Sequence, residues 1–171
     1  MAKQPLAIYL NDHLAGAVTA LELLEYLEKV KGGRILSYSL AALRADIGED
    51  RKVLEALMKQ SGVSIGVVRR AVAWLAEKAA EIKLRADDPD RGAFLLLEAL
   101  DALSVGIEGK RLLWKALAAA GLPNPPGSDY AVLERRAEEQ RGVVEDMRLE
   151  SARVALGANN EAGAVVAPHQ N

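Results

Sequence analysis

The sequence has 171 residues, among which there is no cysteine and only two histidines, His13 and His169. Without a thiol, the chain has no disulfide, no thiolate nucleophile and no ligands for an iron–sulfur cluster or a cysteine-type zinc site. With one histidine in the helical part of the chain and the other near the C-terminus, no Ser/His/Asp arrangement is indicated. These absences exclude thiol chemistry and the familiar hydrolase triads.

Aromatic residues and net charge are also scarce. Half of the residues are hydrophobic but only 4% are aromatic, so the core is built from Leu, Ala, Val and Ile, a composition that favours helices. The 22 basic and 24 acidic residues give a net charge of -2, which offers no general attraction to nucleic acid or to an anionic membrane. No apolar run reaches the roughly 20 residues of a membrane span, and Met1–Leu10 lacks the features of a secretory signal. We therefore expect a cytoplasmic protein with no nucleic-acid or membrane partner.

The six prolines all lie between apolar-periodic stretches and never inside one, as expected if those stretches are helices. Hydrophobic periodicity predicts long helices at about 6–30, 35–60, 88–120 and 128–156, with a shorter helix between 62 and 88. Asp88-Pro89 is a typical helix start, and Ser128 is the predicted N-cap of the last long helix. The length suits one domain at 1–156, followed by small and polar residues at 157–171 that predict a flexible C-terminal tail.

The lengths of the connections predict the topology. Short loops join the first two and the last two long helices, so each pair is expected to form an antiparallel hairpin. About thirty residues separate the two hairpins. One long crossover between two hairpins is the topology of ferritin-like folds. The predicted fold is thus all-α, a ferritin-like four-helix bundle with an extra helix in the long crossover.

Three stretches add a resemblance to this prediction: Tyr9–Gly16 (YLNDHLAG), Ala73–Lys78 (AWLAEK) and Leu97–Lys110 (LEALDALSVGIEGK). They resemble an uncharacterised bacterial family of ferritin-like helical bundles, and the resemblance covers most of residues 6–156. It implies the fold, but it implies no activity.

Metal sites in such bundles take one Glu from each of two helices and a Glu-x-x-His from each of the other two. Glu-x-x-His does not occur here, so the usual two-metal site is excluded. Each predicted long helix nevertheless carries one polar residue in line with its apolar stripe, and counting along the hairpins places the four near one level of the bundle. These residues are His13, Asp50, Glu108 and Gln140.

This predicted polar layer has two interpretations. It is either a self-satisfied structural network, or a non-standard metal or small-ligand site with His13, Asp50 and Glu108 as ligands and Gln140 as a fourth, hydrogen-bonding member. Glycines near the same level, such as Gly16 and Gly106, predict either a close helix approach or an internal cavity, because glycine within a helix is otherwise costly. We favour a non-enzymatic structural or interaction protein without a cofactor, forming a homo-oligomer such as a dimer. The alternative is a metal- or ligand-binding bundle around His13. No protein partner is indicated by any motif.

Overall fold

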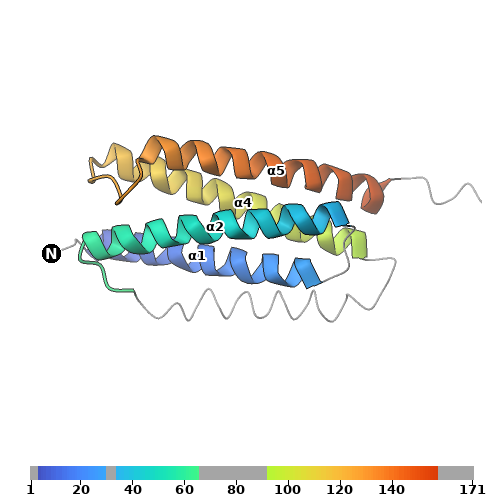
Figure 1. Ribbon diagram of the computed structural model, residues 1–171, viewed down its shortest axis with the longest axis horizontal. Coiled ribbons are helices and arrows are strands. Elements are labelled where there is room, and N and C mark those ends of the chain that lie inside the picture. The colour runs from blue at the N-terminus through green and yellow to red at the C-terminus, as the bar shows by residue number, and fades with distance from the viewer. Residues whose placement is uncertain (1–3, 30–33, 66–91, 158–171) are drawn as a thin grey trace, which may run out of the picture.

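The computed structural model describes residues 4–29, 34–65 and 92–157 (Figure 1). These residues form four long helices and no strand: α1 (Gln4–Lys29), α2 (Arg34–Gln60), α4 (Gly92–Ala119) and α5 (Tyr130–Leu156). The all-α prediction is confirmed for this part of the chain, and the helices end within a few residues of their predicted bounds. The predicted helix start at Asp88 and nearly all of the expected helix at 62–88 lie outside the described residues. So does the expected tail beyond Gly157.

The four helices lie side by side along the long axis of the molecule (Figure 1). α1 and α2 form one antiparallel hairpin and α4 and α5 form the other, and the hairpins meet through α1 against α4 and α2 against α5. α1 and α5 run in one direction, while α2 and α4 run in the other. α4 therefore begins at the opposite end of the bundle from the end of α2.

Glycines in the left-handed region end two of the helices. Gly62 follows α2 and Gly121 follows α4, each with a φ of 66° that side chains with a Cβ rarely adopt. At the end of α2 the Val63 N–H donates to the Met58 carbonyl at 2.8 Å, and Leu122 makes the equivalent bond at the end of α4. This is the Schellman arrangement, which satisfies carbonyls that the helix itself leaves free.

The start of α5 corrects a prediction made from the sequence. Asp129, not Ser128, is the N-cap: its backbone is extended and its Oδ1 accepts a hydrogen bond from the Val132 N–H at 2.8 Å. The Ser128 N–H instead donates to the Pro125 carbonyl at 3.2 Å, which places Ser128 in the preceding turn. Both residue types favour N-caps, so the sequence alone could not choose between two neighbours.

The helices bury two apolar clusters, one in each half of the bundle. The half that contains the start of α1 and the start of α5 is filled by Leu10, Leu14, Leu54, Leu57, Met58, Val63, Leu113, Trp114, Leu117, Tyr130 and Leu133. The other half is filled by Leu23, Leu24, Leu27, Leu40, Leu43, Ile47, Ala99, Leu100, Leu103, Ile107, Ala137 and Val144.

The N-cap assignment is tested by replacing Asp129 with alanine. Asp129→Ala removes the acceptor for the Val132 N–H, so we expect the free energy of unfolding to fall by about 1 kcal/mol. The measurement is urea denaturation followed by circular dichroism. Ser128→Ala is the matched control and should change stability by less than about 0.5 kcal/mol, as is usual for surface substitutions. The reverse ranking of the two variants would contradict the assignment.

Candidate functional site

Three polar side chains from three helices meet inside the bundle, and we call them the interior ion cluster: Asp50 of α2, Lys110 of α4 and Gln140 of α5. The Lys110 ammonium donates to Asp50 Oδ2 at 2.5 Å and also to Gln140 Oε1. The Gln140 Nε2 amide donates to the same Asp50 oxygen at 2.9 Å. Asp50 is only 3% exposed and Gln140 4%, while the Lys110 side chain is 14% exposed.

The position of this cluster follows from the apolar pattern of each helix. Asp50 lies between Ile47 of one apolar cluster and Leu54 of the other, so it occupies an inward-facing position where the two meet. Lys110 lies in the same way between Ile107 and Leu113 on α4. Because leucine or isoleucine would fit the pattern at either position, the charges are exceptions to it.

An arginine borders the cluster. Arg136 Nε lies 3.3 Å from Asp50 Oδ1, and the Arg136 guanidinium also donates to the Asp46 carbonyl at 3.3 Å. The Asp50 carboxylate thus has a different cation at each of its oxygens. Burial lowers the pKa of Lys110, while the charge of Asp50 and its hydrogen bond to Lys110 act in the opposite direction. Desolvation is the largest of these effects, so the pKa of Lys110 is lowered overall.

The structure brings together some of the residues in the predicted polar layer. Asp50 and Gln140 are buried and joined by a hydrogen bond, as their places in the apolar stripes predict. His13 is half-buried on α1 and lines the same cavity as Asp50. Among the described residues no hydrogen bond joins His13 to Asp50, and its ring packs edge-on against Tyr9 with a centroid separation of 4.6 Å.

Glu108 is not in the interior, contrary to its predicted place. The line from Val105 through Glu108 to Leu112 faces outward, since Val105 is 74% and Leu112 49% exposed. The buried side of α4 is rotated from that line and carries Ile107 and Lys110. A charged residue flanked by two apolar residues on one helical line predicts a polar exception in the core, but here both apolar residues are on the surface.

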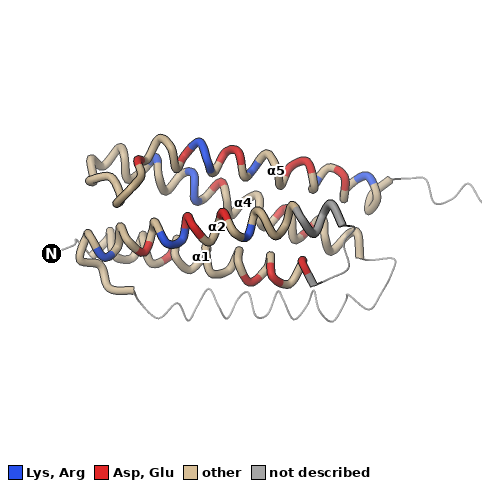
Figure 2. Tube along the Cα trace, viewed as in Figure 1, with Lys and Arg blue, Asp and Glu red and all other residues tan. Residues whose placement is uncertain are grey.

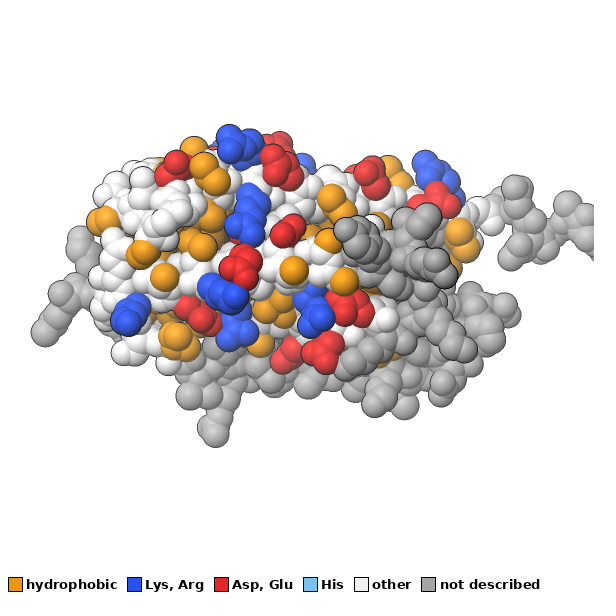
Figure 3. All heavy atoms as spheres, in the orientation of Figure 1, with side chains coloured by type: hydrophobic (Ala, Val, Ile, Leu, Met, Phe, Trp, Pro, Cys, Tyr) orange, Lys and Arg blue, Asp and Glu red, His pale blue; other side chains and the backbone are white. Residues whose placement is uncertain are grey.

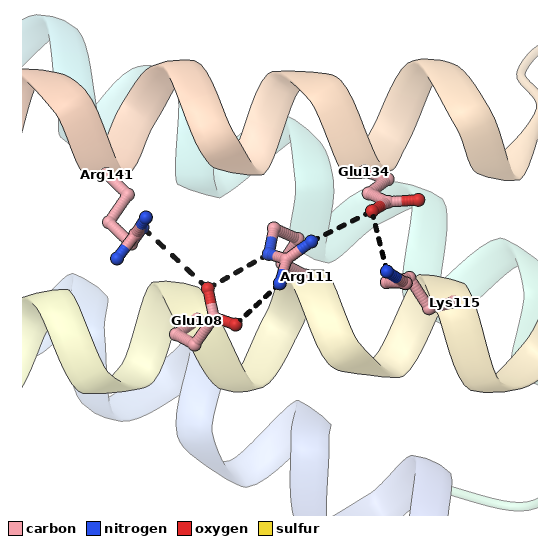
Figure 4. A network of polar contacts seen from close by, with 5 residues as sticks. All are labelled: Glu108, Arg111, Lys115, Glu134 and Arg141. Atoms are coloured by element: carbon pink, nitrogen blue, oxygen red, sulfur yellow. Dashed lines mark hydrogen bonds and ion pairs between the residues drawn. The ribbon is translucent and has the colours of Figure 1, made fainter.

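Glu108 belongs instead to a set of charged side chains on the outside, the α4–α5 surface network (Figure 4). Its carboxylate accepts two hydrogen bonds from Arg111, at 2.8 and 2.9 Å, and lies 3.7 Å from Arg141. Arg111 also donates to Glu134 at 2.9 Å, and Lys115 lies 3.5 Å from the same carboxylate. These contacts lower the pKa of Glu108, chiefly through the hydrogen bonds from Arg111. Charges of both signs continue along α4 and α5 (Figure 2).

Lys110 is the residue of this site that reading the sequence missed. Lysine on an amphipathic helix is normally assigned to the solvent side. The signal that identifies it is its place three residues after Ile107 and three before Leu113, on the line that the structure buries.

A cavity of about 210 Å³ lies beside the interior ion cluster, between α1, α2 and α4, and Asp50, Lys110 and Trp114 form part of its lining. Its wall includes Gly16 of α1 and Gly106 and Gly109 of α4. A Cβ built on any of these three glycines has no neighbouring atom within 4 Å. The structure therefore shows no close helix approach at Gly16 or Gly106, which are both exposed and line this space.

The described residues gather no group of three or more histidine, aspartate or glutamate side chains that could hold a metal ion. Of the predicted ligands, His13 and Asp50 share the cavity, whereas Glu108 lies on the outer side of α4. No described helix is long and apolar enough to cross a membrane.

The interior ion cluster is tested by a double-mutant cycle between Asp50 and Lys110. Lys110→Met keeps most of the apolar stem but leaves Asp50 without its shortest ion pair, so we expect a loss of about 3 kcal/mol in unfolding free energy. Asp50→Leu leaves Lys110 buried without a carboxylate and should also be strongly destabilising. The double variant should lose much less than the sum of the two, measured by urea denaturation. Additive losses would contradict a coupled pair.

Arg111→Met provides the control for that cycle, because it removes the central cation of the α4–α5 surface network. Solvent screens this network and competes for its hydrogen bonds. We expect the variant to be far less destabilising than either single variant of the cycle, measured by the same urea denaturation.

His13 makes the stability of the fold depend on pH. Burial lowers its pKa below the ordinary value of 6.5, and the charge of Asp12 acts more weakly in the opposite direction. The unfolded chain therefore binds a proton at His13 more readily than the folded chain, so stability is full above about pH 6.5 and falls as the pH drops through that value. His13→Gln should flatten this fall in thermal melts between about pH 7.5 and 5.5. Asp12→Asn should steepen it, and equal slopes in all three proteins would contradict the assignment.

Comparisons with protein-family models, with curated proteins and with solved structures gave no significant match. The function of the chain is therefore inferred from the geometry of the interior ion cluster and its surroundings.

Proposed function

We propose that the protein is a non-enzymatic, ferritin-like helical scaffold in which a lysine ammonium occupies the bundle interior in place of metal ions. The observation that carries this proposal is the Lys110 ammonium held by Asp50 and Gln140 from two other helices. Bundles of this topology place metal ions between carboxylates of facing helices. Here one carboxylate is neutralised by a cation of the chain itself.

The helix directions support the ferritin-like part of the proposal. α1 and α5 run one way and α2 and α4 the other, and α4 begins at the end of the bundle opposite to the end of α2 (Figure 1). This order needs one long connection between the hairpins, as ferritin-like folds have.

The hydrogen bonding of the cluster argues against catalysis by its residues. A lysine that acts as a nucleophile or general base needs a free amine. Lys110 instead donates to a carboxylate 2.5 Å away and to an amide oxygen. Gln140 neither titrates nor reacts under ordinary conditions, and its amide bonds Asp50. Lys110 and Gln140 are thus engaged in hydrogen bonds, whereas Asp50 Oδ1 is buried beside Arg136 without a hydrogen bond of its own.

Its role in this proposal is to specify how three helices pair. Moving α2, α4 or α5 along its axis by one turn would separate Lys110 from Asp50 or Gln140 and leave a buried charge unpaired, which is costly. An all-leucine interior would tolerate such slippage better. Buried polar groups fix register in this way in some other helical assemblies.

We further propose that the scaffold acts in the cytoplasm as a homodimer. The support is the outer side of α4, where Val105 is 74% and Leu112 49% exposed, seven residues apart on one helical line. Isolated exposed apolar residues are common, but two on one line suit a self-complementary helix contact. Acidic and basic side chains alternate on the face drawn in Figure 3, with no broad area of one sign, which supports a partner other than nucleic acid.

Native mass spectrometry of protein purified without chelator tests both proposals in one experiment. We expect the mass of two chains with no bound metal, and a shift to the mass of one chain in Val105→Asp. Val154→Asp, at a valine near the end of α5 that is 66% exposed, is the control and should leave the dimer intact. A stoichiometric metal that is lost in Asp50→Asn would overturn the scaffold proposal. A monomeric wild type would overturn only the dimer.

A further inference from the structure

The glycine-lined cavity between α1, α2 and α4 is not needed for the scaffold role, and its size is that of a small organic molecule. Its volume of about 210 Å³ exceeds the roughly 150 Å³ of a protein cavity that takes up benzene. Gly16 and Gly106 in its lining are exposed, so the space is reached from the surface of the bundle and is large enough to take up a small organic molecule.

Three helical positions that line the cavity carry no side chain. Gly16, Gly106 and Gly109 would each meet open space if they had a Cβ. Alanine at these positions would favour the helices and reduce the space. Glycine, which has no side chain, leaves the largest free volume in the cavity at these positions.

The lining combines apolar walls with hydrogen-bond donors that lack acceptors. Ile107 and Leu113 contribute apolar surface. Trp114 also lines the cavity and is 1% exposed, and its indole Nε1–H has no acceptor among the described residues. Lys110 has three ammonium protons and uses two of them, on Asp50 and Gln140. These groups could bond an oxygen atom of an occupant.

The charges around the cavity balance. Asp12 and Asp50 contribute two negative charges to its lining, and Arg51 and Lys110 contribute two positive ones. Burial favours the neutral form of His13. Arg51 already donates to Glu55 at 2.8 Å. Because Lys110 is paired with Asp50 and Arg51 with Glu55, no cation of the lining is free to compensate an anionic ligand, and Asp12 would repel one. The lining therefore favours a neutral molecule over an anion.

We propose that this cavity is a binding site for a small, uncharged aromatic molecule bearing one oxygen, with phenol as the simplest example. The ring fills the space beside Ile107 and Leu113, and the oxygen accepts a hydrogen bond from the Trp114 indole or the Lys110 ammonium.

The test uses the indole signals in proton–nitrogen NMR spectra of the full chain. The sequence has two tryptophans, Trp74 and Trp114, and Trp114→Phe identifies the signal of Trp114. Titration with phenol should shift that signal saturably. Benzene, which has no oxygen, should bind about tenfold more weakly, since it forgoes the hydrogen bond. Benzoate, which is charged, should cause no saturable shift.

Two glycine variants provide a matched pair. Gly109→Leu places a side chain in the cavity, whereas Gly142→Leu makes the same change on α5, where a Cβ also meets open space but the residue does not line the cavity. Both substitutions improve helix propensity. Phenol binding should be lost in Gly109→Leu and kept in Gly142→Leu, and Gly16→Leu serves from the opposite wall if Gly109→Leu does not fold.

Three results would overturn the proposal: no shift of the Trp114 signal with phenol up to its solubility limit, binding of benzoate as tight as that of phenol, or undiminished phenol binding in Gly109→Leu. Equal binding of benzene and phenol would refute the role of the oxygen. None of these results bears on the scaffold proposal, which depends on the metal content of the protein and on Asp50.

Discussion

The buried pair of Asp50 and Lys110 is the constraint on which the interior of this bundle depends. A carboxylate and an ammonium taken out of water are tolerated only when each finds a partner at close range, because the cost of an unpaired buried charge is large. Gln140 bonds both groups, and Arg136 lies at the second oxygen of Asp50. α2, α4 and α5 must therefore keep one mutual register for these contacts to form together.

That requirement connects the two apolar halves of the molecule. Leucine-rich packing on either side of the cluster provides most of the favourable burial, but it is not directional. The interior ion cluster lies where the two halves meet. Its hydrogen bonds and ion pairs, unlike the apolar contacts, depend on the register of the helices. The α4–α5 surface network has similar chemistry and shorter sequence separations, yet solvent screens it, so its effect on stability is smaller. The two sets of charges differ in their effect on stability because one is buried and the other is exposed to solvent, and not because one makes more contacts.

The cavity and the cluster are two results of one local arrangement. Lys110 and Gly109 are neighbours on α4, so the helix turn that directs an ammonium to Asp50 also places a residue without a side chain against α1. The Lys110 ammonium donates to Asp50 and Gln140 within the cluster, and Lys110 is also part of the cavity wall. The interior ion cluster and the cavity therefore share Asp50 and Lys110.

Proline placement and apolar periodicity were sufficient to predict the four long helices, because helix formation depends on local properties of the chain. The same stripes identified Asp50 and Gln140 as interior residues, since each interrupts a strong run of core positions. The orientation of α4 could not be read in this way, because that helix is apolar on several sides and both Glu108 and Lys110 lie between apolar residues. Only contact with α2 and α5 decides which side is buried, which places Lys110 inside and Glu108 with Arg111 at the surface. Whether Gly16 and Gly106 mark a close helix contact was likewise decided only by the tertiary structure, in which no atom of a facing helix lies within 4 Å of a Cβ built at either position.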